Sequence, residues 1–187
     1  NILAPPGRYT VTMRVGDRSQ SQPLRVLPDP DVASTAADLA AQQAMLVEVG
    51  NDIASATVLN SSIENVRTQL RLLGERVAND AQNTDVKTQS GALEQRFSAL
   101  ADTLVQPLPG PFYERAVKLI TRLQYLATHL QTSDYGPTDQ ARESHEFLRG
   151  QLHLVRTEFD TRVRTELSVF NELLRRRGLL PIVVRQP

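Results

Sequence analysis

The sequence predicts a mainly α-helical protein, an elongated antiparallel bundle of two long and two short helices that follows an N-terminal β-hairpin. Three observations favour this class. Residues 9–27 alternate apolar and polar side chains, as half-buried strands do. Residues 34–177 repeat apolar side chains every three or four positions, which is typical of packed helices. Proline and glycine interrupt that helical pattern at 107–111 and 133–137.

Composition limits the function classes. Hydrophobic residues make up 40% of the 187 residues and charged residues 22%, which is typical of a globular protein. The 21 basic and 21 acidic residues cancel, whereas nucleic-acid-binding proteins usually carry a basic excess, so we expect no nucleic-acid partner. No apolar run reaches the roughly 20 residues that span a bilayer, and the absence of cysteine excludes disulfides and thiolate metal sites. The first residue, Asn1, favours a processed or partial portion of a longer product.

The first expected element, at residues 1–30, is a hairpin with one apolar face. Residues 16–19 have the composition of a turn, and Pro28-Asp29-Pro30 ends the second strand. A lone hairpin is marginally stable in water, so its apolar face needs a cover from upstream strands, from the bundle or from another chain. The residues of this face in the first strand are Tyr9, Val11, Met13 and Val15.

The bundle is expected at residues 31–187, and its first helix begins after Ser34 or Thr35, either of which can cap it. Asp38 lies in its first turn, where a helix dipole favours an acid. The apolar stripe continues to Val77, which makes this helix about 65 Å long. Two weak helix-forming segments, Gly50-Asn51 and Asn60-Ser61-Ser62, predict a kink or break.

Three more helices follow. The second begins at a cap formed by Thr84 and ends before 107–111, and the third carries a stripe from Phe112 to Leu130. The fourth begins after the cap Thr138 and ends before Gly178, the expected residue after a helix C-terminus. At 1.5 Å per residue the fourth helix measures about 60 Å and the middle two about 30 Å each.

These lengths predict two long helices that run antiparallel side by side, with the short pair packed against one end and the hairpin near the other. The charges agree with this register, because acidic residues of the first helix would then face basic residues of the fourth. Each exposed pair contributes only about 0–1 kcal/mol. The residues concerned are Asp38, Glu48 and Asp52 on the first helix and Arg162, Arg164 and Arg175 to Arg177 on the fourth.

Catalytic and metal-binding patterns are weak. His145 falls on the apolar stripe of the fourth helix, and its surroundings lack the Glu-x-x-His spacing of a bundle metal centre. We interpret it as a seam histidine hydrogen-bonded to a neighbouring helix, with a metal-binding bundle as the alternative. The sequence has no Gly-x-Ser-x-Gly motif and no Gly-rich phosphate loop. We therefore expect no catalytic residue, no metal and no cofactor.

Two further segments are candidate partner contacts. The loop around Pro109 and Pro111, with Phe112 and Tyr113 after it, would present rigid prolines and aromatics at the tip of the bundle. Alternatively, Phe112 only staples the short helices together. The cluster of Arg175, Arg176 and Arg177 could bind phosphate, an anionic lipid headgroup or an acidic partner. Alternatively, this cluster only complements the dipole at the end of its helix.

Several phrases of the sequence together resemble a known family. They are "PPGRYTVTMRVGDRSQSQPLRVLPDPDV", the long helix after Ser34, "PTDQARESHEFLRGQL" and "FNELLRRRGLLPIVV". They resemble the C-terminal region of secreted bacterial sortilin-like (VPS10-type, BNR-repeat) β-propeller proteins, often labelled glycosyl hydrolases. The resemblance implies that residues 9–15 and 24–27 are the last strands of an incomplete Ig-like sandwich. It also implies a periplasmic or extracellular location, and it carries over no catalytic residue.

The sequence therefore predicts a non-enzymatic structural or interaction module. We expect an accessory or scaffolding subunit of a larger periplasmic or membrane-associated assembly, for example a photosynthetic or respiratory one. Its partners would be proteins, and any membrane association would pass through them. The alternative is the non-catalytic C-terminal tail of a propeller-type secreted hydrolase or peptidase.

Overall fold

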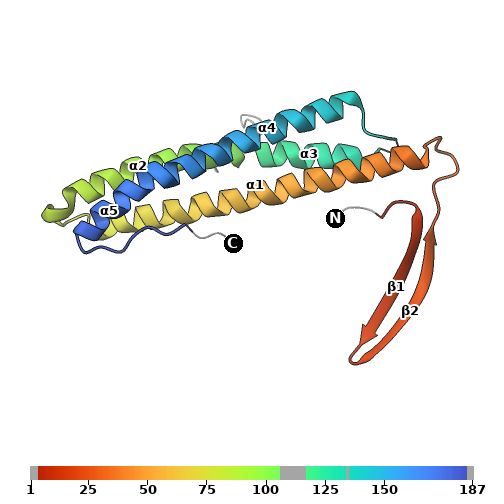
Figure 1. The fold of residues 1–187 in the computed structure, drawn as a ribbon, viewed down its shortest axis with the longest axis horizontal. Helices are drawn as coiled ribbons and strands as arrows, with labels where there is room; N and C mark the ends of the chain where they lie inside the picture. The colour runs from red at the N-terminus through yellow and green to blue at the C-terminus, as the bar shows by residue number, and fades with distance from the viewer. Residues whose placement is uncertain (1–3, 106–116, 134, 185–187) are drawn as a thin grey trace.

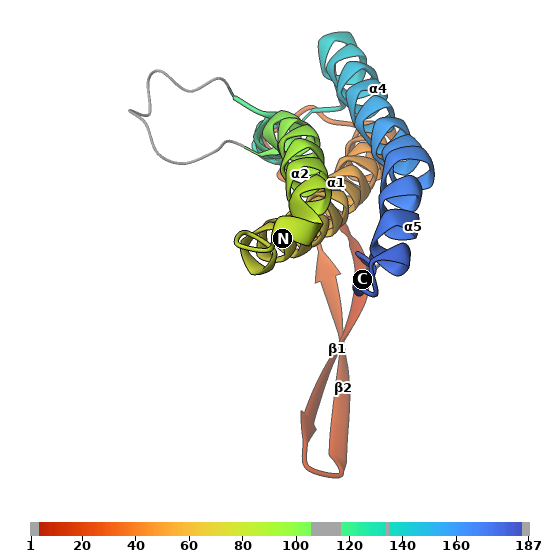
Figure 2. The same cartoon turned by 90° about the vertical axis from the view of Figure 1, so that its left-hand side faces the viewer.

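The structure, a computed structural model, describes residues 4–105, 117–133 and 135–184. It is an elongated bundle of helices with a β-hairpin that projects from one end (Figures 1 and 2). The predicted fold class is confirmed: the protein is mainly α-helical, with two long helices, two shorter helices and an N-terminal hairpin. None of the described helices is long and apolar enough to cross a membrane.

Strands β1 (Gly7–Val15) and β2 (Arg18–Val26) form the antiparallel hairpin. The two-residue loop between them begins with Gly16, whose φ of 57° suits a residue without a Cβ atom. Neither strand packs along a helix, and in Figure 1 the hairpin points away from the bundle. Cover of the apolar face by the bundle, one of the three sequence-based alternatives, is therefore wrong for the described residues.

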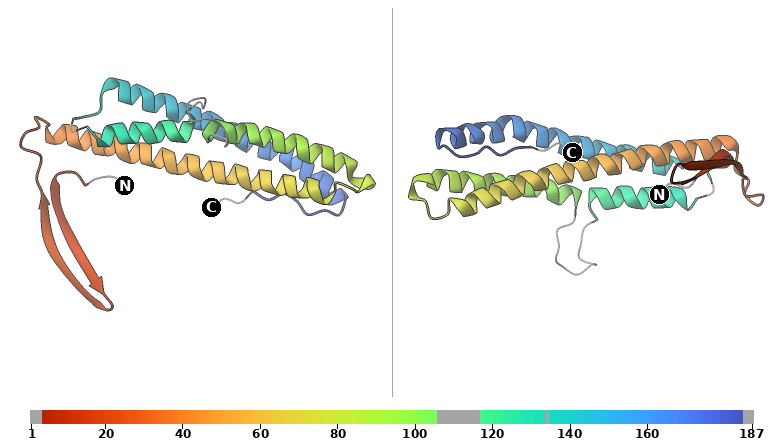
Figure 3. Two further views of the ribbon diagram at one scale, coloured as in Figure 1. Left: turned by 180° about the vertical axis from the view of Figure 1, so that it is seen from behind. Right: turned by 90° about the horizontal axis from the view of Figure 1, so that it is seen from below.

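Helix α1 (Ala36–Arg76) is unbroken over its 41 residues. Thr35 caps it in a capping box, because its hydroxyl accepts from the N–H of Asp38 while the Asp38 carboxylate accepts from the N–H of Thr35. The predicted kink or break near 50–51 and 60–62 is absent, since the helix is continuous there and Figures 1 and 3 show no sharp bend in it. The Ser61 hydroxyl donates to the carbonyl of Thr57 one turn back, so this polar side chain finds its acceptor within the helix.

A short 3₁₀ turn, η1 (Ala81–Asn83), leads to helix α2 (Thr84–Leu104), and helix α3 (Leu119–Gln131) follows. Thr84 is the first residue of α2 rather than its cap, a position held by Asn83. Helix α3 begins later than predicted from the stripe, because residues 117 and 118 are not helical; residues 112–116 lie outside the described residues.

Helices α4 (Asp139–Arg162) and α5 (Ser168–Arg176) are joined by a π-helical turn, η3 (Val163–Leu167), into one rod. The predicted start is confirmed, since the Thr138 hydroxyl accepts from the N–H of Ala141. The predicted end is also confirmed: Gly178 has a φ of 67°, and the N–H of Leu179 donates to the carbonyl of Leu174, as in a Schellman motif.

The π turn has a cause in the apolar stripe. Val155, Phe159, Val163 and Leu167 follow one another at steps of four, whereas an α-helix turns once in 3.6 residues. Three such steps in a regular helix would rotate the stripe away from the core. The wider π turn takes up this excess, so that Phe159 and Leu167 are both buried.

The directions of the long helices differ from the prediction. Arg149 Nη2 lies 2.9 Å from Glu48 Oε2, and Arg156 Nη2 lies 3.3 Å from the carbonyl oxygen of Ser55. Both helices thus advance together, and α4 runs parallel to α1 rather than antiparallel. The short helices are not packed at one end either. Both lie along α1, end to end, and together return the chain to the hairpin end (Figure 3).

The predicted charge pairing fails for the same reason. Arg162 pairs with Glu158 on its own helix, and Arg177 pairs with Asp85 of α2. The acidic half of α1 meets the first half of α4 instead of its basic end.

One hydrophobic core lies between α1, the α2–α3 pair and the α4–α5 rod. The rings of Phe97 and Phe159 meet edge to face with their centroids 5.9 Å apart. After Gly178 the chain turns back along α1, where the N–H of Val183 donates to Gln69 Oε1. The core is therefore complete without the hairpin, as its largest fully buried side chains show: Leu59, Ile63, Leu70, Phe97, Leu104, Leu123, Leu167, Phe170 and Leu174.

Candidate functional site

The hairpin exposes the apolar face that the sequence predicts. The exposed fractions of Val11, Met13 and Val15 are 54%, 62% and 67%. Leu24, opposite Tyr9 in the register, is also exposed. Val26, opposite Gly7, shares this face at the base of the hairpin and is half-buried. The remaining residues of this face on β2 are Gln22, Gln20 and Arg18, so toward the turn the apolar surface follows β1.

Tyr9 differs from its neighbours on this face because it lies at the base of the hairpin. Its side chain is half-buried, and its hydroxyl donates to the carbonyl of Pro5. Close by, a groove is lined by Arg8 and Arg25 on the strands and by Leu39 and Ala40 of α1. The base is thus the part of the hairpin that approaches the bundle.

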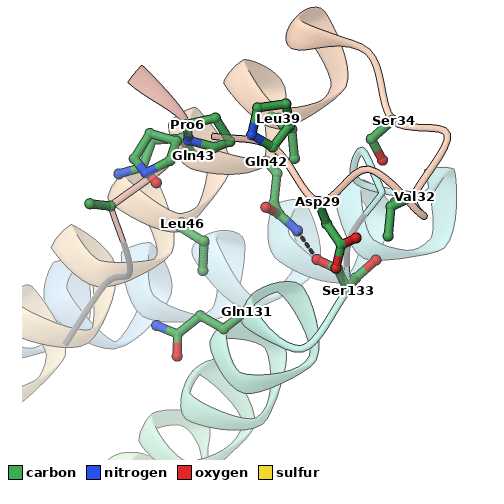
Figure 4. A pocket seen from close by; sticks show the side chains of 13 residues that line it. Pro6, Asp29, Val32, Ser34, Leu39, Gln42, Gln43, Leu46, Gln131 and Ser133 are labelled. Atoms are coloured by element: carbon green, nitrogen blue, oxygen red, sulfur yellow. Dashed lines mark hydrogen bonds between the residues drawn. The ribbon is translucent and has the colours of Figure 1, made fainter. Parts of the chain in front are cut away.

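A small cavity of about 160 Å³ lies at the same junction (Figure 4). Pro6 and Asp29 line it from the two sides of the hairpin, and Leu39 and Leu46 line it from α1. Gln42 fixes this end of the bundle by donating through Nε2 to the carbonyl oxygens of Leu130 and Ser133. The cavity lies where the chain passes from sheet to helix, and its lining comes from the hairpin base, from α1 and from the end of α3.

The second face of the hairpin is polar and basic, a feature that our sequence analysis missed. Arg8 lies directly opposite Arg25, and Arg14 lies on the same face nearer the turn. Within the described residues no ion pair involves any of these three side chains. The signal was present in the sequence, since these arginines alternate with the apolar residues of the same strands.

The arginine cluster is divided between two roles. Arg177 Nη1 donates to the carbonyl of Gln82 and Arg177 Nη2 to Asp85 Oδ2, at 2.7 and 2.8 Å. This residue therefore fastens the end of α5 to the start of α2. Arg175 and Arg176 are exposed in the last turn, where positive charge suits the helix dipole.

His145 lies in a polar cluster between α1 and α4. It is buried, and its Nε2 lies 2.8 Å from Asp52 Oδ2, as expected for a seam histidine. Arg149 donates to the same carboxylate and to Glu48. The hydrogen bond to Glu48, followed by the one to Asp52, raises the pKa of the Arg149 guanidinium. The cluster joins two helices. No group of three or more potential metal ligands occurs in the described part of the chain.

The remaining candidates, Pro109, Pro111, Phe112 and Tyr113, lie outside the described residues. Their expected position at the tip of the bundle therefore stays a prediction. The end of α2 and the start of α3 lie midway along α1 in Figures 1 and 3.

A second exposed apolar site lies between α3 and α4 and was also missed by our sequence analysis. Tyr125 and Phe147 are more than half exposed there, and the Arg122 guanidinium lies 5.3 Å from the centroid of the Phe147 ring. Its only sequence signal is an aromatic residue beside, rather than on, each apolar stripe.

The fold and these surfaces define a class of protein: an elongated helical bundle that holds out an exposed β-hairpin. No protein-family model matches the chain, and searches of curated proteins and of solved structures found no match either. The resemblance to sortilin-like propeller proteins thus stays a prediction from the sequence.

Proposed function

We propose that this chain is a non-enzymatic interaction module, in which the helical bundle presents the β-hairpin to a partner protein. The observation that supports this most strongly is the hairpin itself, with Val11, Met13 and Val15 more than half exposed on one continuous face. A two-stranded hairpin is at best marginally stable alone, and burial of apolar surface contributes about 25 cal/mol per Å². A partner that covers this face would stabilise both the hairpin and the complex.

In this proposal the chain is an accessory or scaffolding subunit of a larger assembly. Its elongated form and complete core suit a rigid spacer, which holds the hairpin at one end. A periplasmic or extracellular location is supported by the sequence resemblance and is compatible with the lack of cysteine. Membrane association would occur only through a partner, for example in a photosynthetic or respiratory complex.

One alternative has its own supporting observation. The hairpin has the two strands and the single apolar face expected for the end of an Ig-like sandwich. If the covering strands belong to the same polypeptide, the chain is the non-catalytic tail of a propeller-type hydrolase or peptidase.

Site-specific cross-linking in cells tests the proposal. Because the chain has no cysteine, a Met13→Cys variant can carry a single photoreactive benzophenone. Leu154→Cys is the matched control, since Leu154 on α4 has the same exposed fraction of 62%. We expect one intermolecular adduct of reproducible mass from position 13 and none from position 154.

Two outcomes decide between the candidates. Cross-links from position 13 only to upstream residues of the same polypeptide favour the tail alternative. No adduct from position 13, or identical adducts from both positions, contradicts a specific partner at the hairpin.

A further inference from the structure

The backbone hydrogen bonds of the hairpin follow from its register. A two-residue loop joins Val15 to Arg18, and the residues that flank such a loop exchange both backbone hydrogen bonds. Bonding alternates from there, so every second residue of β1 directs its N–H and C=O outward. The Thr12 and Ser21 hydroxyls, 2.8 Å apart, fit this pattern, because pairs without mutual backbone bonds lie closest together. The outward residues of β1 are Arg8, Thr10, Thr12 and Arg14.

The two edges are unequal. By the same alternation, the outward residues of β2 are Ser19, Ser21, Pro23 and Arg25. Proline has no N–H, so Pro23 removes a donor from the middle of the β2 edge, as in edges that natural proteins protect from pairing. The β1 edge keeps all four donors and acceptors. A further strand can therefore pair fully only with β1.

Charge indicates which kind of strand fits. The side chains of Arg8 and Arg14 lie on the polar face of β1, six positions apart, with two threonines between them. Across the strand pair Arg8 faces Arg25, and like charges directly opposite each other are unfavourable. An incoming strand with acidic residues opposite Arg8 and Arg14 relieves this repulsion. Its alternate residues would be apolar, because they would extend the face of Tyr9, Val11 and Met13.

From the edges and the charges together, and resting on the function proposed above, we infer that β1 accepts an extended acidic segment of a partner protein as a third strand. This mode of recognition combines backbone hydrogen bonds for affinity with side-chain pairs for specificity. The segment carries two carboxylates six positions apart on one face and apolar side chains on the other.

A second copy of this chain is a poorer occupant. The antiparallel pairing of two β1 strands that uses all four outward residues sets Arg8 of one copy against Arg14 of the other, twice. The apolar faces are also small. Nine residues at about 3.3 Å each make a face about 30 Å long and two strands wide, well below the roughly 800 Å² per partner of a stable dimer.

Binding of a designed peptide to the 187-residue chain tests the inference. The probe is a blocked, fluorescent seven-residue peptide with glutamate at both ends and alternating valine and threonine between them. Fluorescence anisotropy would measure its affinity for two matched variants, Thr12→Pro and Ser21→Pro. Each removes one outward N–H and the same Thr12–Ser21 contact, but on opposite edges. We expect Thr12→Pro to weaken binding at least about tenfold and Ser21→Pro to change it less than about twofold.

A charge reversal provides the second readout, which does not depend on proline. The Arg8→Glu, Arg14→Glu double variant should lose the glutamate peptide and bind a matched peptide with lysine at both ends. Four outcomes would overturn the β1 edge as the site. Both proline variants could weaken binding equally, or Ser21→Pro could have the larger effect. The glutamate peptide could fail to bind the unaltered chain, or the double variant could fail to reverse the preference.

An adduct from position 13 would still support the proposed function in each case. A concentration-dependent dimer by size-exclusion chromatography that Thr12→Pro abolishes would identify a second copy as the occupant and overturn the acidic segment.

Discussion

At the scale of single residues, the Asp52 carboxylate on α1 accepts hydrogen bonds from α4 and so joins the two parallel long helices. Its carboxylate lies 2.8 Å from His145 Nε2 and 3.1 Å from Arg149 Nε, and the exposed fraction of its side chain is 17%. Glu48, one turn away, contacts the same arginine from a side chain that is 54% exposed. Two carboxylates in one cluster therefore differ in burial, which allows their contributions to be separated.

We expect Asp52→Ala to lower the free energy of unfolding by about 1–3 kcal/mol, because it leaves the buried His145 without this hydrogen bond. Glu48→Ala should lower it by less than about 1 kcal/mol, since exposed pairs are weak. Urea denaturation followed by circular dichroism measures both. Equal effects of the two substitutions would contradict the special position of Asp52.

The capping box of α1 should make the stability of the protein depend on pH. Hydrogen bonds from the Thr35 hydroxyl and then from its backbone N–H lower the pKa of Asp38. A carboxyl with a lowered folded-state pKa stabilises the protein above its unfolded pKa of about 4, and this contribution is lost as the pH falls through the folded value. The difference in stability between the unaltered chain and Asp38→Asn should therefore be constant near neutral pH and shrink in acid. A difference that grows on acidification would show that the cap does not act through the ionised carboxylate.

At the scale of elements, the π turn in the α4–α5 rod takes up one residue more than an α-helix needs. Deletion of the exposed Thr165 should turn Val163–Leu167 into a regular α-helix with both flanking stripes still facing the core. Deletion of Thr157, also exposed but inside α4, rotates one stripe by about 100° relative to the other.

We expect the Thr165 deletion to cost less than about 2 kcal/mol and the Thr157 deletion to cost several kcal/mol or to prevent folding, because it moves core residues into solvent. Thermal unfolding of both variants is the measurement, and the helical signal at low temperature is the control for folding. If the Thr165 deletion lowers stability more than the Thr157 deletion, the π turn does not simply contain one residue more than the helix needs.

Elements with a strong local signal were predicted well. Thr138 and Gly178 mark the ends of the fourth helical segment because caps depend on a few neighbouring residues. The π turn was not predicted, although the apolar residues of the fourth helical segment are spaced by four positions three times in succession. Such spacing fits either a regular helix whose apolar stripe rotates away from the core or a wider turn. The choice depends on the packing of residues such as Phe97 against Phe159. The apolar face of the hairpin was predicted from alternation, whereas its basic face requires the register that sets Arg8 against Arg25.

At the scale of the whole molecule, helix lengths alone did not determine the topology. The same four lengths fit two layouts: a short pair that doubles back at one end, or a short pair that lies end to end along α1. The structure has the second layout, which makes the chain run up, down and up (Figures 1 and 3). The decision lies in contacts between distant segments, such as Arg67 with Glu94 and Gln42 with the carbonyl of Leu130.

The same layout separates the stability of the bundle from that of the hairpin. The hydrophobic core contains side chains from the helices and the C-terminal segment and none from β1 or β2. Replacing residues 9–24 with two glycines joins Arg8 to its facing residue Arg25 and keeps Pro5, Pro6 and Asp29 at the junction.

We expect the melting temperature of this variant to differ from that of the unaltered chain by less than about 3 °C. The core loses no side chain, so the free energy of unfolding of the bundle stays nearly the same. Differential scanning calorimetry measures it, and Arg177→Ala, which removes the clamp between α5 and α2, is the comparison that should lower the midpoint. A loss of more than about 5 °C on removal of the strands would mean that the hairpin is part of the cooperative fold rather than an element that the bundle holds out for a partner.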